Sequence, residues 1–418
     1  MNLKSQLYRL LRWSEKYTKT DMVYLARGGF WLTTGKIVAA LFSFLLAIAF
    51  AHFLPREIYG NYKYILSIGI VVGAFSLTGF GPAIIQAVSR GYEGTLRFAF
   101  WTNLKWSIAI ILISLAGASY YFLNNNNTFA LSFLIIGAFS PFLNSARFYG
   151  AYLNGKKEFR TLMTFGIIST SLQAVSLFLA LLLTKNPVVL VFVYFFTTTT
   201  VNLALHFLTL KIYKPPDKVD PKIFNFSAHL SILDILHTVV GQLDKILIFH
   251  FLGGTSLAIY AFAQAPVVEF RSVLKLLHPL AIPKFSAQSK NETRKTLPLK
   301  MVKLSLMLII PVVIYILLAP YLYRIFFPKY TDAIFFSQVF SLVLLFFPKK
   351  LAGTALLAHA EKKKLYTVTI SALATRLVLL LILVPLFGIL GAILAELGTH
   401  LISTVIVNHQ LQRIQDKS

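Results

Sequence analysis

Basic side chains lie deep inside apolar stretches of this sequence, where they need a partner or water. The six are Lys36, Lys245, Arg271, Lys349, Lys350 and Arg376. In a membrane-spanning helix, each cation that faces lipid costs about 2.5 to 3.5 kcal/mol. Six such costs would exceed a typical net free energy of unfolding, which is about 5 to 15 kcal/mol. We therefore expect most of these side chains to face a wet cavity or one another.

Acidic side chains are scarcer in the same stretches. They are Asp234, Asp244, Glu269 and Glu396. Guanidinium and ammonium groups bind phosphate oxygens strongly. The excess of cations therefore predicts an anionic ligand such as a phosphate or diphosphate. For each single residue, a structural ion pair with a neighbouring helix is the alternative interpretation.

Helical spacing places many of these residues on shared faces. At 100° per residue, one stripe comprises Asp234, His237, Gly241, Asp244 and Lys245. Two further stripes comprise Gln264, Arg271, Lys275 and His278, and Glu396, His400 and Ser403. An acid near a histidine can relay a proton, and an acid in a cavity can hold a sodium ion. The candidate ion-coupling residues are Asp234, His237, Asp244, Glu396 and His400.

Membrane-spanning helices must position these side chains. Hydrophobic residues make up 57% of the chain and the mean hydropathy is +0.71, above the roughly 45 to 50% that soluble domains contain. Apolar runs long enough to cross a hydrocarbon layer of about 30 Å recur along the chain. They cover residues 30–54, 62–88, 101–123, 129–153, 162–183, 187–210, 226–252, 257–280, 302–327, 334–357, 365–386 and 389–407. The sequence predicts an all-α polytopic membrane protein with about 12 transmembrane helices.

Lysine and arginine concentrate in alternate loops between the predicted helices, which the positive-inside rule assigns to the cytoplasm. This distribution accounts for the formal net charge of +25, so we expect no nucleic-acid partner. Residues 1–29 are predicted to form an amphipathic segment on the cytoplasmic surface. Both termini should therefore be cytoplasmic.

A polar, proline-rich segment at residues 211–223 divides the predicted helices six and six. It predicts one six-helix bundle at 30–210, a second at 224–408, and a cytoplasmic tail at 409–418. Short strings also recur: His52-Phe53-Leu54 with Tyr62, and His250-Phe251-Leu252 with Tyr260, share an offset of 198 residues (250 − 52 and 260 − 62). Transporters built from such repeats bind substrate where the repeats meet.

Catalytic and metal-binding motifs are absent from the sequence. There is no cysteine, which excludes zinc fingers and thiol catalysis. No zinc-protease, Walker or nucleophile-elbow motif is present. We therefore expect no catalytic residue, no metal and no cofactor. The candidate energy sources are an ion gradient of protons or sodium, the membrane potential and the substrate concentration.

Two stretches carry a resemblance to a known family. They are Gly241-Gln242-Leu243-Asp244-Lys245 through His250-Phe251-Leu252-Gly253 to Tyr260-Ala261-Phe262, and Ala51-His52-Phe53-Leu54-Pro55 with Tyr59-Gly60-Asn61-Tyr62. In these stretches the chain resembles the polysaccharide transporter proteins, the Wzx-type lipid-linked oligosaccharide flippases. These belong to the multidrug/oligosaccharidyl-lipid/polysaccharide exporter (MOP) superfamily.

The resemblance implies a fold, a substrate and a location. The implied fold is two six-helix bundles forming a V around a central cationic lumen. The implied substrate is an undecaprenyl-diphosphate-linked oligosaccharide repeat unit, moved to the outer leaflet of a bacterial inner membrane for O-antigen, capsule or exopolysaccharide biosynthesis. Implied partners are membrane lipid, a glycan polymerase and export machinery. No functional position is transferred from the family, and the six cations are the expected substrate-binding residues.

Two other functions compete with this interpretation. A multidrug or other cation-coupled antiporter of the same superfamily would need an acidic lumen, against which the excess of cations argues. A membrane-embedded glycan polymerase or acyltransferase would need a large external loop or a catalytic His/Asp pair at the membrane surface. Neither feature is visible in the sequence.

Overall fold

The computed structural model describes residues 22–274, 289–359 and 361–413. Most of the predicted amphipathic segment at 1–29 lies outside these residues, as do Lys275 and His278. Within them every regular element is a helix, which confirms the all-α prediction. The chain forms two compact units: an N-terminal unit, Ile37–Ala258, and a C-terminal unit that combines Met1–Lys36 with Ile259–Ser418.

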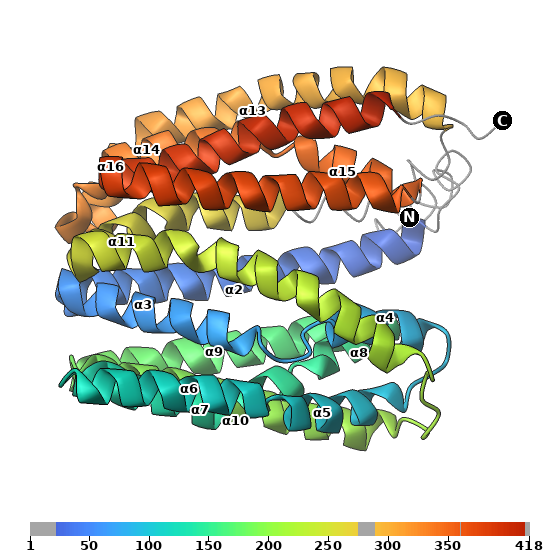
Figure 1. Ribbon diagram of the computed structural model, residues 1–418, viewed down its shortest axis with the longest axis horizontal. Helices are drawn as coiled ribbons and strands as arrows, with labels where there is room; N and C mark the ends of the chain where they lie inside the picture. The colour runs from blue at the N-terminus through green and yellow to red at the C-terminus, as the bar shows by residue number, and fades with distance from the viewer. Residues whose placement is uncertain (1–21, 275–288, 360, 414–418) are drawn as a thin grey trace, which may run out of the picture. The chain divides into compact units, whose positions relative to one another are not determined.

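The N-terminal unit contains most of α2, all of α3 to α10 and the first part of α11 (Figure 1). The helices are α2 (Met22–Phe53), α3 (Arg56–Gly73), α4 (Phe80–Ser89), α5 (Thr95–Trp106), α6 (Ile108–Leu123), α7 (Asn127–Ala146), α8 (Phe148–Gly155), α9 (Phe159–Leu183), α10 (Pro187–Tyr213) and α11 (Ile223–Leu274). The segment at 211–223, predicted to separate two bundles, therefore lies within this unit. The predicted division into two bundles of six helices stays a prediction.

One predicted helix, at residues 62–88, is in fact two helices, α3 and α4, separated by residues 74–79. Side chains from other helices bind the backbone at this break. The Leu77 N–H donates to Asn103 Oδ1 at 2.8 Å, and the Gly79 N–H donates to Ser231 Oγ at 2.9 Å. Such partners make an interruption tolerable inside a membrane protein. Hydropathy averages over the break and could not reveal it.

The C-terminal unit contains the start of α2, the end of α11 and four further α-helices with two short 3₁₀ helices. These are α13 (Lys290–Phe326), η2 (Pro328–Tyr330), α14 (Ala333–Ser341), η3 (Leu342–Phe346), α15 (Lys349–Ala358) and α16 (Lys362–Gln412). Ser289 caps α13 by accepting from the Glu292 N–H at 3.1 Å, a typical N-cap bond.

The 51-residue helix α16 is a hairpin. As a straight helix it would measure about 77 Å, more than twice the hydrocarbon thickness of about 30 Å. Gly388 interrupts it with φ 58° and ψ −130°, a conformation that favours glycine. Arg376 and Glu396, on opposite sides of Gly388, form an ion pair at 2.9 Å. The two arms of α16 therefore pack antiparallel.

Helix α11 contains a similar interruption. Its 52 residues are also too long for one crossing, and Gly253, with φ 80° and ψ −178°, divides it. Nine helical stretches of the described residues are long and apolar enough to cross a membrane. Counting the two arms of α11 and of α16 separately, and adding α3, gives twelve crossings, as predicted.

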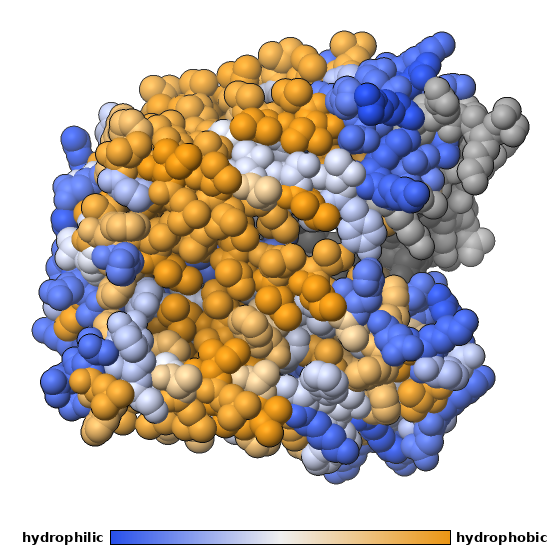
Figure 2. All heavy atoms as spheres, in the orientation of Figure 1, coloured by the Kyte–Doolittle hydropathy of each residue, from blue (hydrophilic) through white to orange (hydrophobic). Residues whose placement is uncertain are grey.

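The outer surface of the helices is apolar. Figure 2 shows hydrophobic residues over the middle of the helices and hydrophilic residues toward their ends. Leu123, Leu183 and Leu386 are 79%, 87% and 69% exposed. Soluble proteins rarely leave such contiguous apolar surface in water, so the chain is a multi-pass membrane protein.

Candidate functional site

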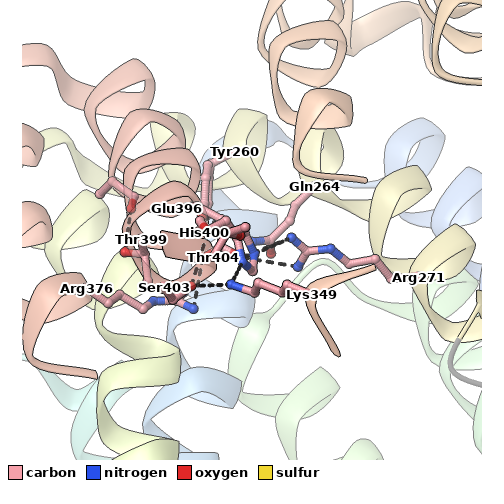
Figure 3. Close-up of polar contacts among 11 residues, drawn as sticks. Tyr260, Gln264, Arg271, Lys349, Arg376, Glu396, Thr399, His400, Ser403 and Thr404 are labelled. Atoms are coloured by element: carbon pink, nitrogen blue, oxygen red, sulfur yellow. Dashed lines mark hydrogen bonds and ion pairs between the residues drawn. The ribbon is translucent and has the colours of Figure 1, made fainter. Parts of the chain in front are cut away.

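Five predicted site residues meet in the C-terminal unit (Figure 3). Arg271 comes from the end of α11, and Lys349 is the first residue of α15. Arg376 comes from the first arm of α16, while Glu396 and His400 come from the second arm. Together with Ser403 they form what we call the polar cluster, which comprises Arg271, Lys349, Arg376, Glu396, His400 and Ser403.

Glu396 binds two arginines. Its side chain is only 8% exposed. Arg376 approaches Oε2 at 2.9 Å, and Arg271 donates to Oε1 from both terminal nitrogens at 3.1 and 3.2 Å. Both carboxylate oxygens are thus engaged by guanidinium groups, so this carboxylate is already neutralised by the protein itself.

His400 connects the carboxylate to the lysine. Its Nδ1 contacts the Lys349 ammonium, and its Nε2 lies 3.2 Å from Glu396 Oε1. Nε2 also lies 3.0 Å from a terminal nitrogen of Arg271, so the imidazole contacts Lys349, Glu396 and Arg271 at once. Lys349 also donates to Ser403 Oγ at 2.5 Å.

The polar cluster carries a positive excess. Three basic side chains, Arg271, Lys349 and Arg376, meet one carboxylate, Glu396. The side chains of both arginines are 21% exposed, so they are not sealed from ligands. Such a set attracts anions and can bind phosphate oxygens through several donors.

A cavity of about 700 Å³ opens next to the polar cluster. Its walls come from α13, η3, the start of α15 and the second arm of α16. Lys349 belongs both to the polar cluster and to the cavity wall. The cavity and the cluster therefore share one cation.

Lys36 and Lys350 lie in the C-terminal unit but outside the polar cluster. Lys36 is exposed on α2. The half-buried Lys350 places its ammonium 5.9 Å from the centre of the Phe347 ring, within cation–π range.

The other predicted residues belong to the N-terminal unit. Asp244 is 1% exposed, and its Oδ1 accepts from the Lys245 N–H at 2.8 Å. The Lys245 ammonium donates to Gln242 Oε1 at 2.9 Å. Asp234 and His237 are exposed. Among the described residues, no group of His, Asp and Glu side chains has the arrangement of a metal site.

Sequence reasoning missed a cation in the N-terminal unit. Arg147, between α7 and α8, lines a cavity of about 200 Å³ together with Asn144 and Thr238. Arg147 falls inside the predicted helix at 129–153, so its charge was an available signal. Its presence gives the N-terminal unit a basic cavity residue as well.

Solved structures of transporters share this fold. An outward-facing multidrug resistance MATE family transporter of the MOP superfamily matches with a TM-score of 0.64 and 12% identity, over 92% of this chain and 95% of that one. A MOP superfamily transporter from Pyrococcus furiosus, described as having a binding pocket of reverse polarity, matches with a TM-score of 0.61 and 13% identity, over 93% and 95%. The lipid II flippase MurJ in an inward closed conformation matches with a TM-score of 0.57 and 13% identity, over 90% and 86%.

Curated protein sequences gave no match. A family model described as "Polysaccharide biosynthesis protein" matches residues 25–286, more than half of the chain. The match confirms the family resemblance, and the solved structures confirm the predicted twelve-helix architecture. This multi-pass membrane protein, which has the fold of the MOP superfamily transporters, belongs to the polysaccharide biosynthesis protein family.

Proposed function

We propose that this protein is a flippase for an undecaprenyl-diphosphate-linked oligosaccharide repeat unit. It would carry the unit from the cytoplasmic to the outer leaflet of a bacterial inner membrane, with both termini in the cytoplasm, and deliver it to glycan polymerase and export machinery. Two six-helix bundles would open alternately to the two sides, as in transporters with repeated halves.

The observation that carries this proposal is the positive excess of the polar cluster. Arg271 and Arg376 are held in place by Glu396, and their partly exposed guanidinium groups offer planar, multiple donors suited to phosphate. A diphosphate carries the matching charge. The family match and the similarity to a lipid II flippase support a lipid-linked cargo.

A multidrug antiporter is the second candidate, because several MATE transporters share the fold. A cationic drug needs an available carboxylate. In the polar cluster both oxygens of Glu396 are engaged by arginines, so the site offers a drug cation no such group. The chemistry of the cluster favours the anionic cargo.

The test is deletion of this protein, which should abolish surface polysaccharide, followed by complementation of the deletion strain with variants. Arg271→Ala and Lys349→Ala should each abolish surface polysaccharide while the protein remains in the membrane at normal levels. Lys303→Ala is the matched control, because Lys303 is an exposed cation of α13 outside the polar cluster, and it should restore the polysaccharide fully.

Two results would refute the proposal. One is full complementation by both cluster variants. The other is unchanged polysaccharide in the deletion strain together with increased sensitivity to cationic drugs, which would indicate the antiporter instead.

A further inference from the structure

The cavity beside the polar cluster has the composition of a site for an amphiphile. Its apolar wall includes Leu299, Val302, Leu306 and Ile309 of α13, which recur at intervals of three or four and so share one helix face. They are 60%, 55%, 58% and 42% exposed. The volume of about 700 Å³ falls within the range of about 300 to 1,000 Å³ that ligand pockets occupy.

The polar side chains of this cavity are basic or neutral. Arg294 and Lys295 line it near the start of α13, and Lys349 lines it beside the polar cluster. No acidic residue occurs among the described residues that line it. Arg294 and Ile309 are 15 residues apart, about 22 Å along a helix, so the cavity runs from a basic end into the apolar part of the membrane.

We propose that this cavity binds an anionic membrane phospholipid, such as phosphatidylglycerol. Its phosphate pairs with Arg294 and Lys295, and an acyl chain covers the exposed apolar face of α13. The lipid is a resident of the C-terminal unit, distinct from any transported cargo, and Lys349 brings it next to the polar cluster.

The test uses the purified full chain in nanodiscs of phosphatidylcholine, with and without phosphatidylglycerol. Phosphatidylglycerol should raise the melting temperature of the wild-type protein. The double variant Arg294→Gln/Lys295→Gln should melt at the same temperature in both membranes. The control Lys300→Gln/Lys303→Gln removes two charges from the same helix outside the cavity wall and should keep the full shift.

A second measurement does not depend on the basic end. Leu306→Trp fills the cavity from an exposed position, so it should remove the phospholipid that native mass spectrometry detects on the purified wild-type protein. The proposal fails if the control double variant loses the shift as well, or if inorganic phosphate alone reproduces it. It also fails if a polyprenyl phosphate stabilises the protein and phosphatidylglycerol does not. None of these measurements involves transport, so they stand apart from the test of the flippase.

Discussion

Glu396 holds two guanidinium groups at once, so the loss of its charge affects both. Removing one partner from a buried ion pair costs about 3 to 5 kcal/mol. Because the arginine side chains are 21% exposed and water can solvate them in part, we expect Glu396→Gln to lower the free energy of unfolding by about 3 kcal/mol. Thermal unfolding in detergent measures this loss. Asp234→Asn, at an exposed acid, should change stability by less than about 0.5 kcal/mol, and an equal loss in both variants would contradict the structural role of Glu396.

Glu361, which lies just before α16 and outside the membrane-spanning segments, makes the stability of the protein depend on pH. The hydrogen bond from Lys290 at 2.7 Å, together with the nearby Lys364 ammonium, holds the pKa of Glu361 below its usual value of 4.5. A depressed carboxyl pKa stabilises the folded state above about pH 4.5, and this stabilisation is lost as the pH falls through the folded-state pKa.

Glu361→Gln should therefore lower the melting temperature at pH 7 by the equivalent of about 1 kcal/mol or less, since the side chain is 21% exposed. The difference from the wild type should shrink as the pH is lowered from about 6 to about 3. Melting curves across that range test the sign. A difference that grows on acidification would rule out the ion pairs as its source.

At the scale of elements, the α16 hairpin depends on one close approach. A Cβ at Gly391 would lie 1.9 Å from the Leu383 carbonyl oxygen on the other arm, so Gly391→Ala must push the two arms apart. Gly353, in the middle of α15, has nothing within 4 Å of the position of its Cβ. Alanine there gains up to about 1 kcal/mol of helix propensity.

We expect Gly391→Ala to reduce the melting temperature and the yield of folded protein, and Gly353→Ala to leave both unchanged or raise them. Circular dichroism melting of the two purified variants provides the comparison. If Gly391→Ala melts like the wild type, the arms are not packed as tightly as described.

The number of helices could be predicted from sequence because the signal is compositional: about twenty apolar residues must be helical to cross lipid. Interruptions depend on partners far along the chain, as at residues 74–79, where Asn103 and Ser231 bind the backbone. Hydropathy contains no information about such partners. The break between α3 and α4 was therefore missed.

The candidate site was predictable in membership but not in geometry. A charge inside an apolar run is visible to inspection, so Arg271, Lys349, Arg376 and Glu396 could all be named. Which of them meet depends on the hairpin at Gly388 and on packing between helices. For that reason the sequence could not separate these residues from Lys245, which lies in the other unit.

For the whole molecule, the absence of native cysteine makes membrane orientation directly testable. The distribution of basic residues assigns Lys185 to the outer side and Lys222 to the cytoplasm, and both residues are exposed. In intact cells, a membrane-impermeant maleimide should label Lys185→Cys and leave Lys222→Cys unlabelled. Both variants should react once the membrane is permeabilised. The reverse pattern would show that the chain has the opposite orientation, which would contradict the proposed cytoplasmic position of Lys222.

The ion pair across α16 also bears on how the chain is made. Arg376 leaves the ribosome about twenty residues before Glu396, and an isolated arm carrying an unpaired arginine pays about 2.5 to 3.5 kcal/mol to enter lipid. When the arms enter together, each brings the counter-charge of the other. We therefore expect the insertion machinery to hold the first arm of α16 until the second arm has been synthesised. Both arms then enter the bilayer together as a preformed pair of helices.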